Sequence, residues 1–487
     1  MKVAICYPSF ETSKGIPQIS QNRQFQWTTS GPVAYFIYPV VPASAATLLK
    51  TKGYDVYWLD GLAQKQSYEE WSSKLGEINP ELIAIETKTP VIKKHWQIID
   101  NIKDIYPGIK IVLMGDHVTA LPLESMKNSR VDFVITGGDY DFLLLNIANF
   151  LSQKQKLEPG IWYRNQKKII NTGKFKLDHN LDSLPIIDRD LTKWYLYAYK
   201  NSNFFRTPGA YTMFGRDCWW GKCTFCSWTT LFPGNCYRTI SVKKALDEVG
   251  NLITKYQIKE IMDDSGAFPT GDWLRNFCQG MIKRGYHKKV YFNCNMRFNA
   301  GLSEKDYQLM GKAGFRFILY GLESASQKTL DKINKNLKVE NIQPVLEWAK
   351  LGGLMPHLTV MVGYPWENKV DLDRTISLAE KFFTKGLADS MQATIIIPYP
   401  GTPLFDYCKK NKLLTTTNWD HYDMRQPVMK TNIPEIELLG AVRELYSKSI
   451  LNPKFILKTI LMLKNWDGVK YVAFQGFKFF GKLWEFR

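Results

Sequence analysis

The order of apolar segments along this 487-residue chain constrains its fold more than any other feature. Short apolar runs without polar alternation, such as IAIE at 83–86 and IVLMG at 111–115, are typical of parallel strands that are covered on both faces. Between such runs lie longer segments with the helical period of about 3.6 residues, such as residues 95–108. Strands that alternate with helices in this way predict an α/β protein.

The alternation falls into two blocks. Residues 1–150 predict a doubly wound, Rossmann-like domain, and residues 205–430 predict a partial (β/α)6 barrel of the TIM type with its chemistry at the C-terminal strand ends. Residues 151–204 are less regular and contain the Pro, Asp and Leu mixture LDSLPIIDRDL, so we expect a linker there. Residues 431–487 are expected to form a small helical region that is basic and rich in aromatic residues.

Three cysteines lie close together in RDCWWGKCTFCSW, immediately after the first barrel strand, where barrels of this kind place function. These are Cys218, Cys223 and Cys226, called the cysteine trio below. A [4Fe–4S] cluster needs four ligand positions, so three thiolates leave one iron open. The open iron can chelate the amino and carboxylate groups of S-adenosylmethionine and pass an electron to its sulfonium, which yields a carbon radical. The trio therefore predicts a radical enzyme with a [4Fe–4S] cluster.

An alternative reading of the trio is a structural zinc site with Cys236 as the fourth ligand. Zinc sites favour paired C-x2-C sequences, and only one such pair is present, so the cluster is favoured. The cysteines outside the trio are scattered and form no disulfide framework, which indicates a reducing compartment. They are Cys6, Cys236, Cys278, Cys294 and Cys408.

Several motifs follow the trio in order along the barrel region. They are DDSGAF at 263–268, NCNMRFN at 293–299, YGLESAS at 320–326, GYPWE at 363–367 and PYPGTPLF at 398–405. With these motifs, residues 205 to about 430 resemble the radical S-adenosylmethionine superfamily. The whole chain resembles its cobalamin-binding class, which contains cobalamin-dependent methylases and the anaerobic porphyrin ring cyclase. One departure is the four residues between Cys218 and Cys223, where the family has three.

The resemblance implies roles for other barrel residues. Phe225 is expected to pack against the adenine of S-adenosylmethionine, and Arg297 and Glu323 are expected to contact its ribose or methionine part, with Asn295 as a weaker candidate. The alternative for Arg297 and Glu323 is an ion pair in the barrel interior, because buried Arg and Glu are usually paired. Asn295, at a strand end, has turn chemistry as its alternative role. No catalytic residue beyond these cofactor contacts is assigned.

The resemblance also implies that the first domain binds cobalamin at the C-terminal edge of its sheet. The cofactor-binding candidates there are small, hydroxyl or acidic residues in three loops: Thr87, Thr89, Gly115, Asp116, Gly137 and Gly138. Glycines in such places can instead simply turn the chain. The D-x-H-x-x-G motif, whose His ligates cobalt, is absent, and His117 is not assigned as a ligand. The lower face of the cobalt is then expected to be left to water or to a side chain other than His.

Two functions of this class remain open. The leading expectation is a C-methyltransferase that makes a radical on an unactivated substrate carbon and gives it a methyl group from methylcobalamin. The alternative is a radical oxidative cyclase or rearrangement enzyme with cobalamin as a redox partner. Both need a reductant such as flavodoxin or ferredoxin. From another class, the net charge of +18 permits a tRNA-modifying or metal-stabilised nucleic-acid-binding protein, but no RNA-binding module is recognisable, so nucleic acid is not favoured.

The sequence of the C-terminal region bears on where in the cell the protein lies and on the kind of substrate it takes. No run of about 18 uncharged apolar residues and no signal peptide are recognisable, so a cytoplasmic location is expected. Residues 441–487 contain nine Lys or Arg against three Asp or Glu, together with many aromatic residues. Such a helix can lie in a bilayer interface, which predicts peripheral membrane contact and a small-molecule or lipid-like substrate rather than nucleic acid. The alternative is a helix pair that covers the open side of the barrel.

Overall fold

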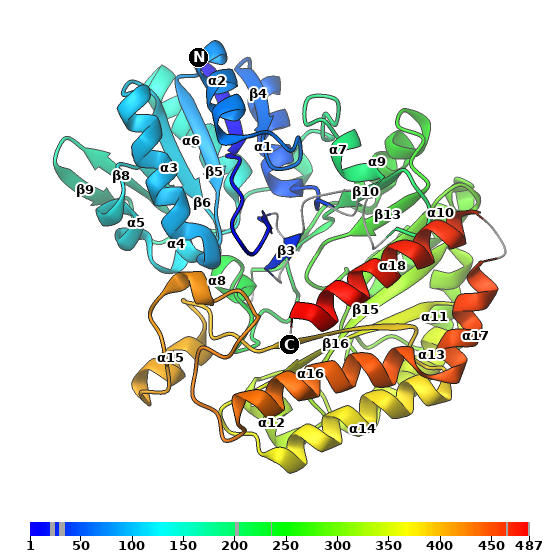
Figure 1. The fold of residues 1–487 in the computed structure, drawn as a ribbon. Helices are drawn as coiled ribbons and strands as arrows, with labels where there is room; N and C mark the ends of the chain where they lie inside the picture. Colours follow the sequence, from blue (N-terminus) through cyan, green and yellow to red (C-terminus); the bar gives the residue numbers. More distant parts are fainter. Residues whose placement is uncertain (20–24, 29–34, 200–203, 235, 464–465, 486–487) are drawn as a thin grey trace.

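The computed structural model describes residues 1–19, 25–28, 35–199, 204–234, 236–463 and 466–485. Two sheets of mainly parallel strands organise the chain, one of seven strands and one of six. Figure 1 shows the first domain in blue to cyan at the upper left and the barrel in green to yellow on the right and at the bottom. This arrangement confirms the predicted α/β fold of two successive units.

The sheet of the first domain has the strand order β4-β1-β5-β6-β7-β8-β9. Its parallel strands are β1 (Lys2–Tyr7), β4 (Asp55–Asp60), β5 (Leu82–Glu86), β6 (Lys110–Met114) and β7 (Phe133–Ile135). The chain adds β4 on one side of β1 and then β5 on the other. Strand order therefore reverses between β1 and β5, and doubly wound sheets bind ligands beyond the C-terminal strand ends at such a point.

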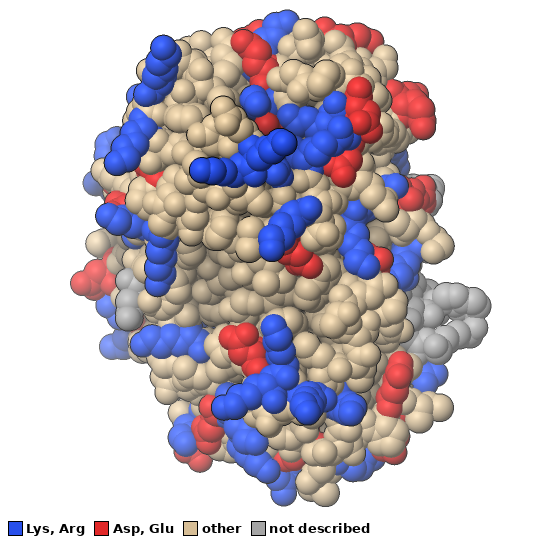
Figure 2. Space-filling view, turned by 90° about the vertical axis from the view of Figure 1, so that its left-hand side faces the viewer, with Lys and Arg blue, Asp and Glu red and all other residues tan. Residues whose placement is uncertain are grey.

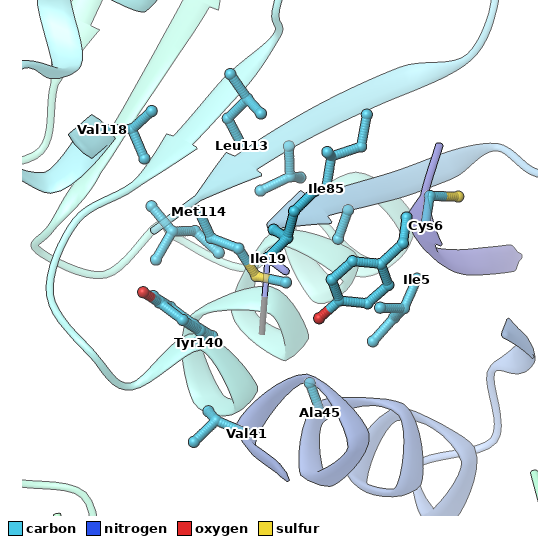
Figure 3. Close-up of a cluster of buried hydrophobic side chains, with 14 of the residues drawn as sticks. Ile5, Cys6, Ile19, Val41, Ala45, Ile85, Leu113, Met114, Val118 and Tyr140 are labelled. Carbon is cyan, nitrogen blue, oxygen red and sulfur yellow. The ribbon is translucent and has the colours of Figure 1, made fainter. Parts of the chain in front are cut away.

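Helices cover both faces of this sheet. On one face α1 (Val40–Thr51) packs beside α6 (Tyr140–Gln153). Figure 3 shows Val41 and Ala45 of α1 and Tyr140 of α6 around a core that includes Ile5 and Ile85 of the sheet. The opposite face carries three further helices: α2 (Tyr68–Ile78), α3 (Ile92–Ile105) and α5 (Pro122–Asn128). Helix α2 begins at a capping box formed by Ser67 and Glu70, which satisfies backbone N–H groups at its first turn.

The first sheet continues beyond residue 150, which corrects the predicted start of the linker. Strands β8 (Ile161–Asn165) and β9 (Lys168–Asn171) form an antiparallel hairpin, and β8 pairs with β7 at the sheet edge. The hairpin was missed because its strands are short and half-buried. The irregular part of the predicted linker begins after Asn171, and it contains α7 (Tyr195–Ala198).

The second sheet has six parallel strands in the order β10-β13-β14-β15-β16-β17, which confirms the predicted partial barrel. The strands are β10 (Gly209–Thr212), β13 (Glu260–Asp263), β14 (Tyr291–Met296), β15 (Phe315–Glu323), β16 (Met355–Val362) and β17 (Ser390–Ile395). The main outer helices are α9 (Val242–Thr254), α10 (Gly271–Lys283), α11 (Glu304–Lys312), α13 (Ile342–Leu351), α14 (Lys369–Lys385) and α15 (Pro403–Lys410). In the described residues β10 and β17 do not pair, so the barrel has an open side.

The C-terminal region is helical, as expected. Helix α16 (Glu435–Ile450) packs on β17, where the Tyr446 hydroxyl donates to the backbone oxygen of Ala393 at 3.1 Å. Two more helices follow, α17 (Pro453–Met462) and α18 (Trp466–Glu485). Tyr471 of α18 lies 5.4 Å from Phe205, which precedes β10, so α16 and α18 together cover the open side (Figure 1). Among the described residues, no helix is both long and apolar enough to span a membrane.

Candidate active site

A cavity of about 690 Å³ occupies the barrel interior. Its walls include alternate residues of β15, from Phe317 to Glu323, because the odd-numbered side chains of this strand point inward. Seven candidates from the sequence line this one cavity: Cys218, Cys223, Phe225, Cys226, Asn295, Arg297 and Glu323. The structure therefore brings together residues that are more than one hundred positions apart in the sequence.

The cysteine trio lies on a loop between two short elements, β11 (Gly215–Arg216) and α8 (Trp228–Leu231). The extra residue in its first interval is accommodated by a turn at Gly221, where φ is 57° and a Cβ would lie 2.8 Å from the Cα of Gly234. The indole of Trp220 donates to the backbone oxygen of Asn334 at 2.7 Å, and the Asn334 amide donates to the backbone oxygen of Lys222 at 3.1 Å. These contacts hold the longer loop on the barrel.

The thiols of the trio have the chemistry that an iron–sulfur cluster requires. Cys223 is buried, and the Arg297 guanidinium donates to its sulfur at 3.4 Å. Burial raises the pKa of the Cys223 thiol, although Lys335 and Arg297 act in the opposite direction. Within the described residues, no three His, Cys, Asp or Glu side chains converge as they would around a single ion. A [4Fe–4S] cluster binds each thiolate at a different iron, so its ligands need no such convergence, and the donor set fits the cluster.

Cys236 is placed differently from the trio. Its half-buried side chain packs against the core of the first domain and does not line the cavity. The zinc site considered from the sequence therefore has no geometric support from this residue.

Glu323 has the features of a ligand-binding carboxylate. It lies at the end of β15 with φ of 61°, beside a register shift in the pairing with β16. One carboxylate oxygen accepts a hydrogen bond from the Lys335 ammonium at 2.6 Å, whereas the other oxygen is buried without a partner. A non-glycine residue at positive φ and an unsatisfied buried oxygen each require an explanation, and functional sites provide one.

Arg297 follows β14 directly, and no carboxylate pairs with it among the described residues. Its guanidinium donates to the Asn299 side-chain oxygen at 3.2 Å and to the backbone oxygen of Lys335. The guanidinium also lies 5.4 and 5.3 Å from the ring centroids of Trp219 and Trp220. Arg297 and Glu323 therefore do not form the ion pair considered from the sequence. Glu323 pairs with Lys335 instead, and the Arg297 guanidinium lines the cavity.

Lys335 is a site residue that sequence reasoning missed. Its ammonium pairs with Glu323 and lies 5.9 Å from the ring centroid of Phe225. The segment around Lys335 carries no motif, so only the folded chain reveals it. Asn295 also lines the cavity, and its side-chain amide donates to the backbone oxygen of Ser265 at 2.9 Å, in the loop after the neighbouring strand β13.

None of the six cofactor-binding candidates in the first domain lines this cavity. Two hydroxyls contact histidines: Thr87 Oγ1 lies 2.7 Å from His95 Nδ1, and Thr89 Oγ1 lies 3.2 Å from His117 Nδ1. Asp116 forms a buried ion pair with Lys88 at 3.8 Å.

Close contacts explain the glycines of this region. A Cβ on Gly115 would lie 2.1 Å from the backbone oxygen of Thr87. On Gly137 and Gly138 it would lie 2.5 and 2.0 Å from the rings of Phe175 and Phe232. In this structure, aromatic side chains therefore fill the space above Gly137 and Gly138 that the sequence interpretation reserved for a corrin.

His117 is a buried residue with contacts to the protein on several sides. Its Nε2 lies 3.3 Å from a Glu124 carboxylate oxygen, and its ring lies 6.4 and 5.3 Å from those of Trp96 and Trp419. Together with the contact to Thr89, this arrangement is that of a structural histidine.

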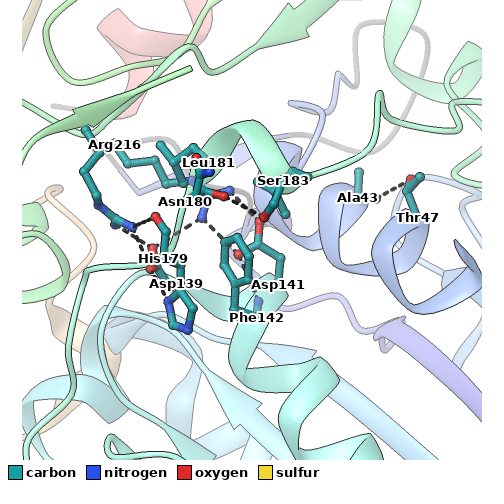
Figure 4. A network of polar contacts seen from close by, with 12 residues as sticks. Ala43, Thr47, Asp139, Asp141, Phe142, His179, Asn180, Leu181, Ser183 and Arg216 are labelled. Carbon is teal, nitrogen blue, oxygen red and sulfur yellow. Dashed lines mark hydrogen bonds and ion pairs between the residues drawn. The ribbon is translucent and has the colours of Figure 1, made fainter. Parts of the chain in front are cut away.

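A buried ionic network joins the two domains beside the trio, and Figure 4 shows it. Arg216 contacts Asp141 at 2.5 Å, whereas Arg238 and His179 contact Asp139 at 2.8 Å each. Although burial opposes it, hydrogen bonding to Asp139 and Glu158 raises the pKa of His179 to about 9. Arg216 lies two residues before Cys218, so this network fixes the loop of the trio against the first domain.

Comparisons with known proteins agree with this geometry. Residues 212–379 match the radical SAM superfamily. An uncharacterized methyltransferase of Pyrococcus horikoshii is 27% identical over 437 residues, which are 89% of this chain and 90% of the relative. An anaerobic magnesium-protoporphyrin IX monomethyl ester cyclase of Cereibacter sphaeroides is 24% identical over 87% of this chain and 68% of its own length. The solved structure of OxsB, a cobalamin-dependent S-adenosylmethionine radical enzyme, covers 99% of this chain with a TM-score of 0.72, at 13% identity and over 72% of its own length.

The barrel, its cavity and the match over residues 212–379 define the class of this part of the chain: it is a radical S-adenosylmethionine domain. Along its whole length it has the two-domain fold of the cobalamin-dependent members of that superfamily, as the likeness to OxsB shows. The predicted recognition and fold class are thereby confirmed.

Proposed function

We propose that this enzyme is a cobalamin-dependent C-methyltransferase that acts on an unactivated carbon of a small-molecule or lipid-like substrate. One observation carries the proposal. The cysteine trio, the Arg297 guanidinium and the half-paired carboxylate of Glu323 line the same cavity near the C-terminal ends of the barrel strands. Reductive cleavage of S-adenosylmethionine needs a cluster within one enclosed space. The same space needs a cation that binds the carboxylate of the cofactor and an acceptor that binds its ammonium or hydroxyl groups.

The residues of the cavity divide this work. The trio would hold the cluster, which supplies the electron for cleavage of S-adenosylmethionine. The Arg297 guanidinium suits the methionine carboxylate, because charge-assisted hydrogen bonds are the stronger ones. The free oxygen of Glu323 can accept a hydrogen bond from a ribose hydroxyl or an ammonium group, and Phe225 offers an aromatic surface for the adenine.

Cobalamin belongs to the proposal through the first domain, where it would supply the methyl group. Support comes from the reversal of strand order between β1 and β5 and from the fold shared with OxsB, a cobalamin-dependent enzyme. The loops with Thr87, Thr89 and Asp116 lie at that edge. Binding requires Phe232, which stacks on Trp228 at 5.7 Å, to move from above Gly138.

The second candidate function is a radical oxidative cyclase or rearrangement enzyme. The observation that favours it is the 24% identity to the Cereibacter sphaeroides cyclase over most of this chain. The relative from Pyrococcus horikoshii, named as a methyltransferase and similar over 90% of its length, supports methyl transfer instead.

The proposal includes a reductant such as flavodoxin or ferredoxin, and a cytoplasmic location with peripheral membrane contact. Nucleic acid is not a favoured partner. On the face shown in Figure 2, Lys and Arg lie in separate groups, several of them beside Asp or Glu, rather than in one continuous basic patch. Binding along a phosphate backbone needs such a patch.

Methyl-labelled S-adenosylmethionine distinguishes the two candidate functions. Protein reconstituted anaerobically with iron, sulfide and cobalamin is incubated with this label, a reductant and an extract of candidate small molecules and lipids. A methyltransferase moves the label into a product, whereas a cyclase or rearrangement enzyme consumes S-adenosylmethionine and leaves products unlabelled. A Cys226→Ala variant, treated identically, controls for methylation by traces of other enzymes.

A further inference from the structure

The cavity extends beyond the cluster site along the barrel. Both Met355, the first residue of β16, and Met361, near its end, line the cavity. Six residues of a strand span roughly 20 Å, because each adds about 3.3 Å. The cavity is therefore elongated and runs from the cysteine trio toward the N-terminal ends of the strands.

The C-terminal helices form the wall at this far end. Side chains from α17 and α18 line the cavity there, together with Leu451 before them. From α17 these are Phe455 and Thr459, which lie four residues apart and so share one helix face. From α18 they include Tyr471 and Val472. Methionine, aromatic and aliphatic groups lie here between polar ones such as His357, Asp389 and Gln475, which suits a long, mainly apolar molecule that carries some polar groups.

The opposite face of α17 is apolar and exposed. Six of the sixteen exposed large hydrophobic residues in the described chain fall within residues 456–466, so this patch is not a random scatter. We call these residues the α17 patch: Ile456, Leu457, Ile460, Leu461, Leu463 and Trp466. Single exposed apolar residues are ordinary, whereas a contiguous group marks an interaction site.

The charged residues in the sequence of this segment indicate its partner. Residues 451–466 contain Lys454, Lys458 and Lys464 and no Asp or Glu. A helix that presents apolar residues beside lysines binds an anionic bilayer by burying its apolar face in the interface while the lysines approach the lipid phosphates. At ten residues α17 is too short to cross a bilayer, so it would lie along the surface.

We propose that the α17 patch docks this enzyme on an anionic membrane surface, and that an elongated, lipid-derived substrate enters the barrel there, between α17 and α18. The substrate part of this inference rests on the proposed function, since the radical forms at the other end of the cavity. Helix α17 separates the two environments: its Phe455 and Thr459 face the cavity, and its Leu457 and Leu461 face the bilayer.

The docking half is tested with vesicles of phosphatidylglycerol and phosphatidylcholine and the full chain with its cluster. We expect the protein to float with these vesicles, and to float less at 1 M salt, where the Debye length falls to about 3 Å. The Leu457→Glu/Leu461→Glu variant should bind about tenfold or more weakly. The matched control Leu351→Glu/Val370→Glu replaces two equally exposed residues outside the patch and should bind as the native chain does.

The entry half is tested with a dansyl-labelled undecanoic acid as probe. Thr459→Trp places an indole on the cavity face of α17, whereas Ile460→Trp places it on the exposed face as a matched control. We expect Thr459→Trp to abolish probe fluorescence enhancement and Ile460→Trp to retain it. Equal binding of the probe by both variants would contradict entry past α17.

The outcomes separate this inference from the proposed function. If the native chain ignores vesicles yet forms 5′-deoxyadenosine from S-adenosylmethionine, the docking inference is overturned and the enzyme activity stands. If the native chain binds vesicles but forms no 5′-deoxyadenosine, the docking inference is supported and the proposed function is overturned. A dimer in sedimentation that dissociates in the Leu457→Glu/Leu461→Glu variant, without vesicle binding, would show that a second copy covers the patch and would also overturn the inference.

Discussion

Replacing Glu323 with Gln tests whether one carboxylate oxygen of this residue binds S-adenosylmethionine. The substitution keeps the shape of the side chain, and its remaining oxygen can still accept the hydrogen bond from Lys335, which in the native chain measures 2.6 Å. What it removes is the negative charge on the oxygen that has no protein partner. If that oxygen binds S-adenosylmethionine, the lost charge-assisted hydrogen bond contributes about 1.5–3 kcal/mol.

Each 1.4 kcal/mol corresponds to about a tenfold change in affinity, so the Kd for S-adenosylmethionine should rise by roughly 10- to 150-fold. Calorimetry on the anaerobically reconstituted variant measures this Kd, and the absorbance of the cluster verifies that the site is still assembled. Cys236→Ala, outside the cavity, serves as the control and should bind normally. A Glu323→Gln protein that retains its cluster and binds S-adenosylmethionine within about twofold of the native value would refute the assigned role.

Three further predictions follow from the structure. Replacing any member of the cysteine trio by Ala should abolish iron binding as measured by iron analysis, whereas Cys236→Ala should retain four irons, the number in one cluster. His179 has a raised folded-state pKa of about 9 against about 6.5 when unfolded, so its ion pairs stabilise the protein fully below pH 6.5 and progressively less up to pH 9. After allowance for partial exposure, about 1–2 kcal/mol of unfolding free energy should be lost over that window in urea titrations, and His179→Gln should flatten the dependence. His117→Ala should still bind cobalamin with an unchanged visible spectrum, because His117 contacts Thr89 and Glu124 rather than a cobalt site.

The barrel and the position of its chemistry could be predicted because both leave local signals. Buried parallel strands are short apolar runs, and the cysteine trio follows the first of them in the loop where barrels place ligands. Residues at the ends of successive parallel strands meet at one edge, so Arg297 after β14 and Glu323 at the end of β15 could be assigned to the same site from their order alone.

Features that depend on contacts between distant segments could not be predicted. Lys335 lies in the site because the chain after β15 folds back and brings the Lys335 ammonium against the Glu323 carboxylate. Positions 137 and 138 have no room for a side chain, because the rings of Phe175 and Phe232 from other parts of the chain pack against Gly137 and Gly138. No periodicity in the sequence reveals these contacts between distant segments.

The C-terminal region illustrates the same limit. Its apolar and basic residues fitted both a membrane-binding helix and a helix packed on the barrel. The folded chain assigns Thr459 to the cavity wall and Leu457 to the exposed face of the same helix. The sequence alone could not make that division, because it depends on where α18 crosses the open side.

The most direct test of the central claim is the product formed from S-adenosylmethionine by the reduced enzyme. Anaerobically reconstituted protein is reduced and incubated with S-adenosylmethionine, and 5′-deoxyadenosine and methionine are measured by mass spectrometry. A cluster on the cysteine trio predicts that both products form in the native chain and that neither forms in the Cys218→Ala variant. A native protein that contains zinc instead of iron and yields no 5′-deoxyadenosine would contradict the account.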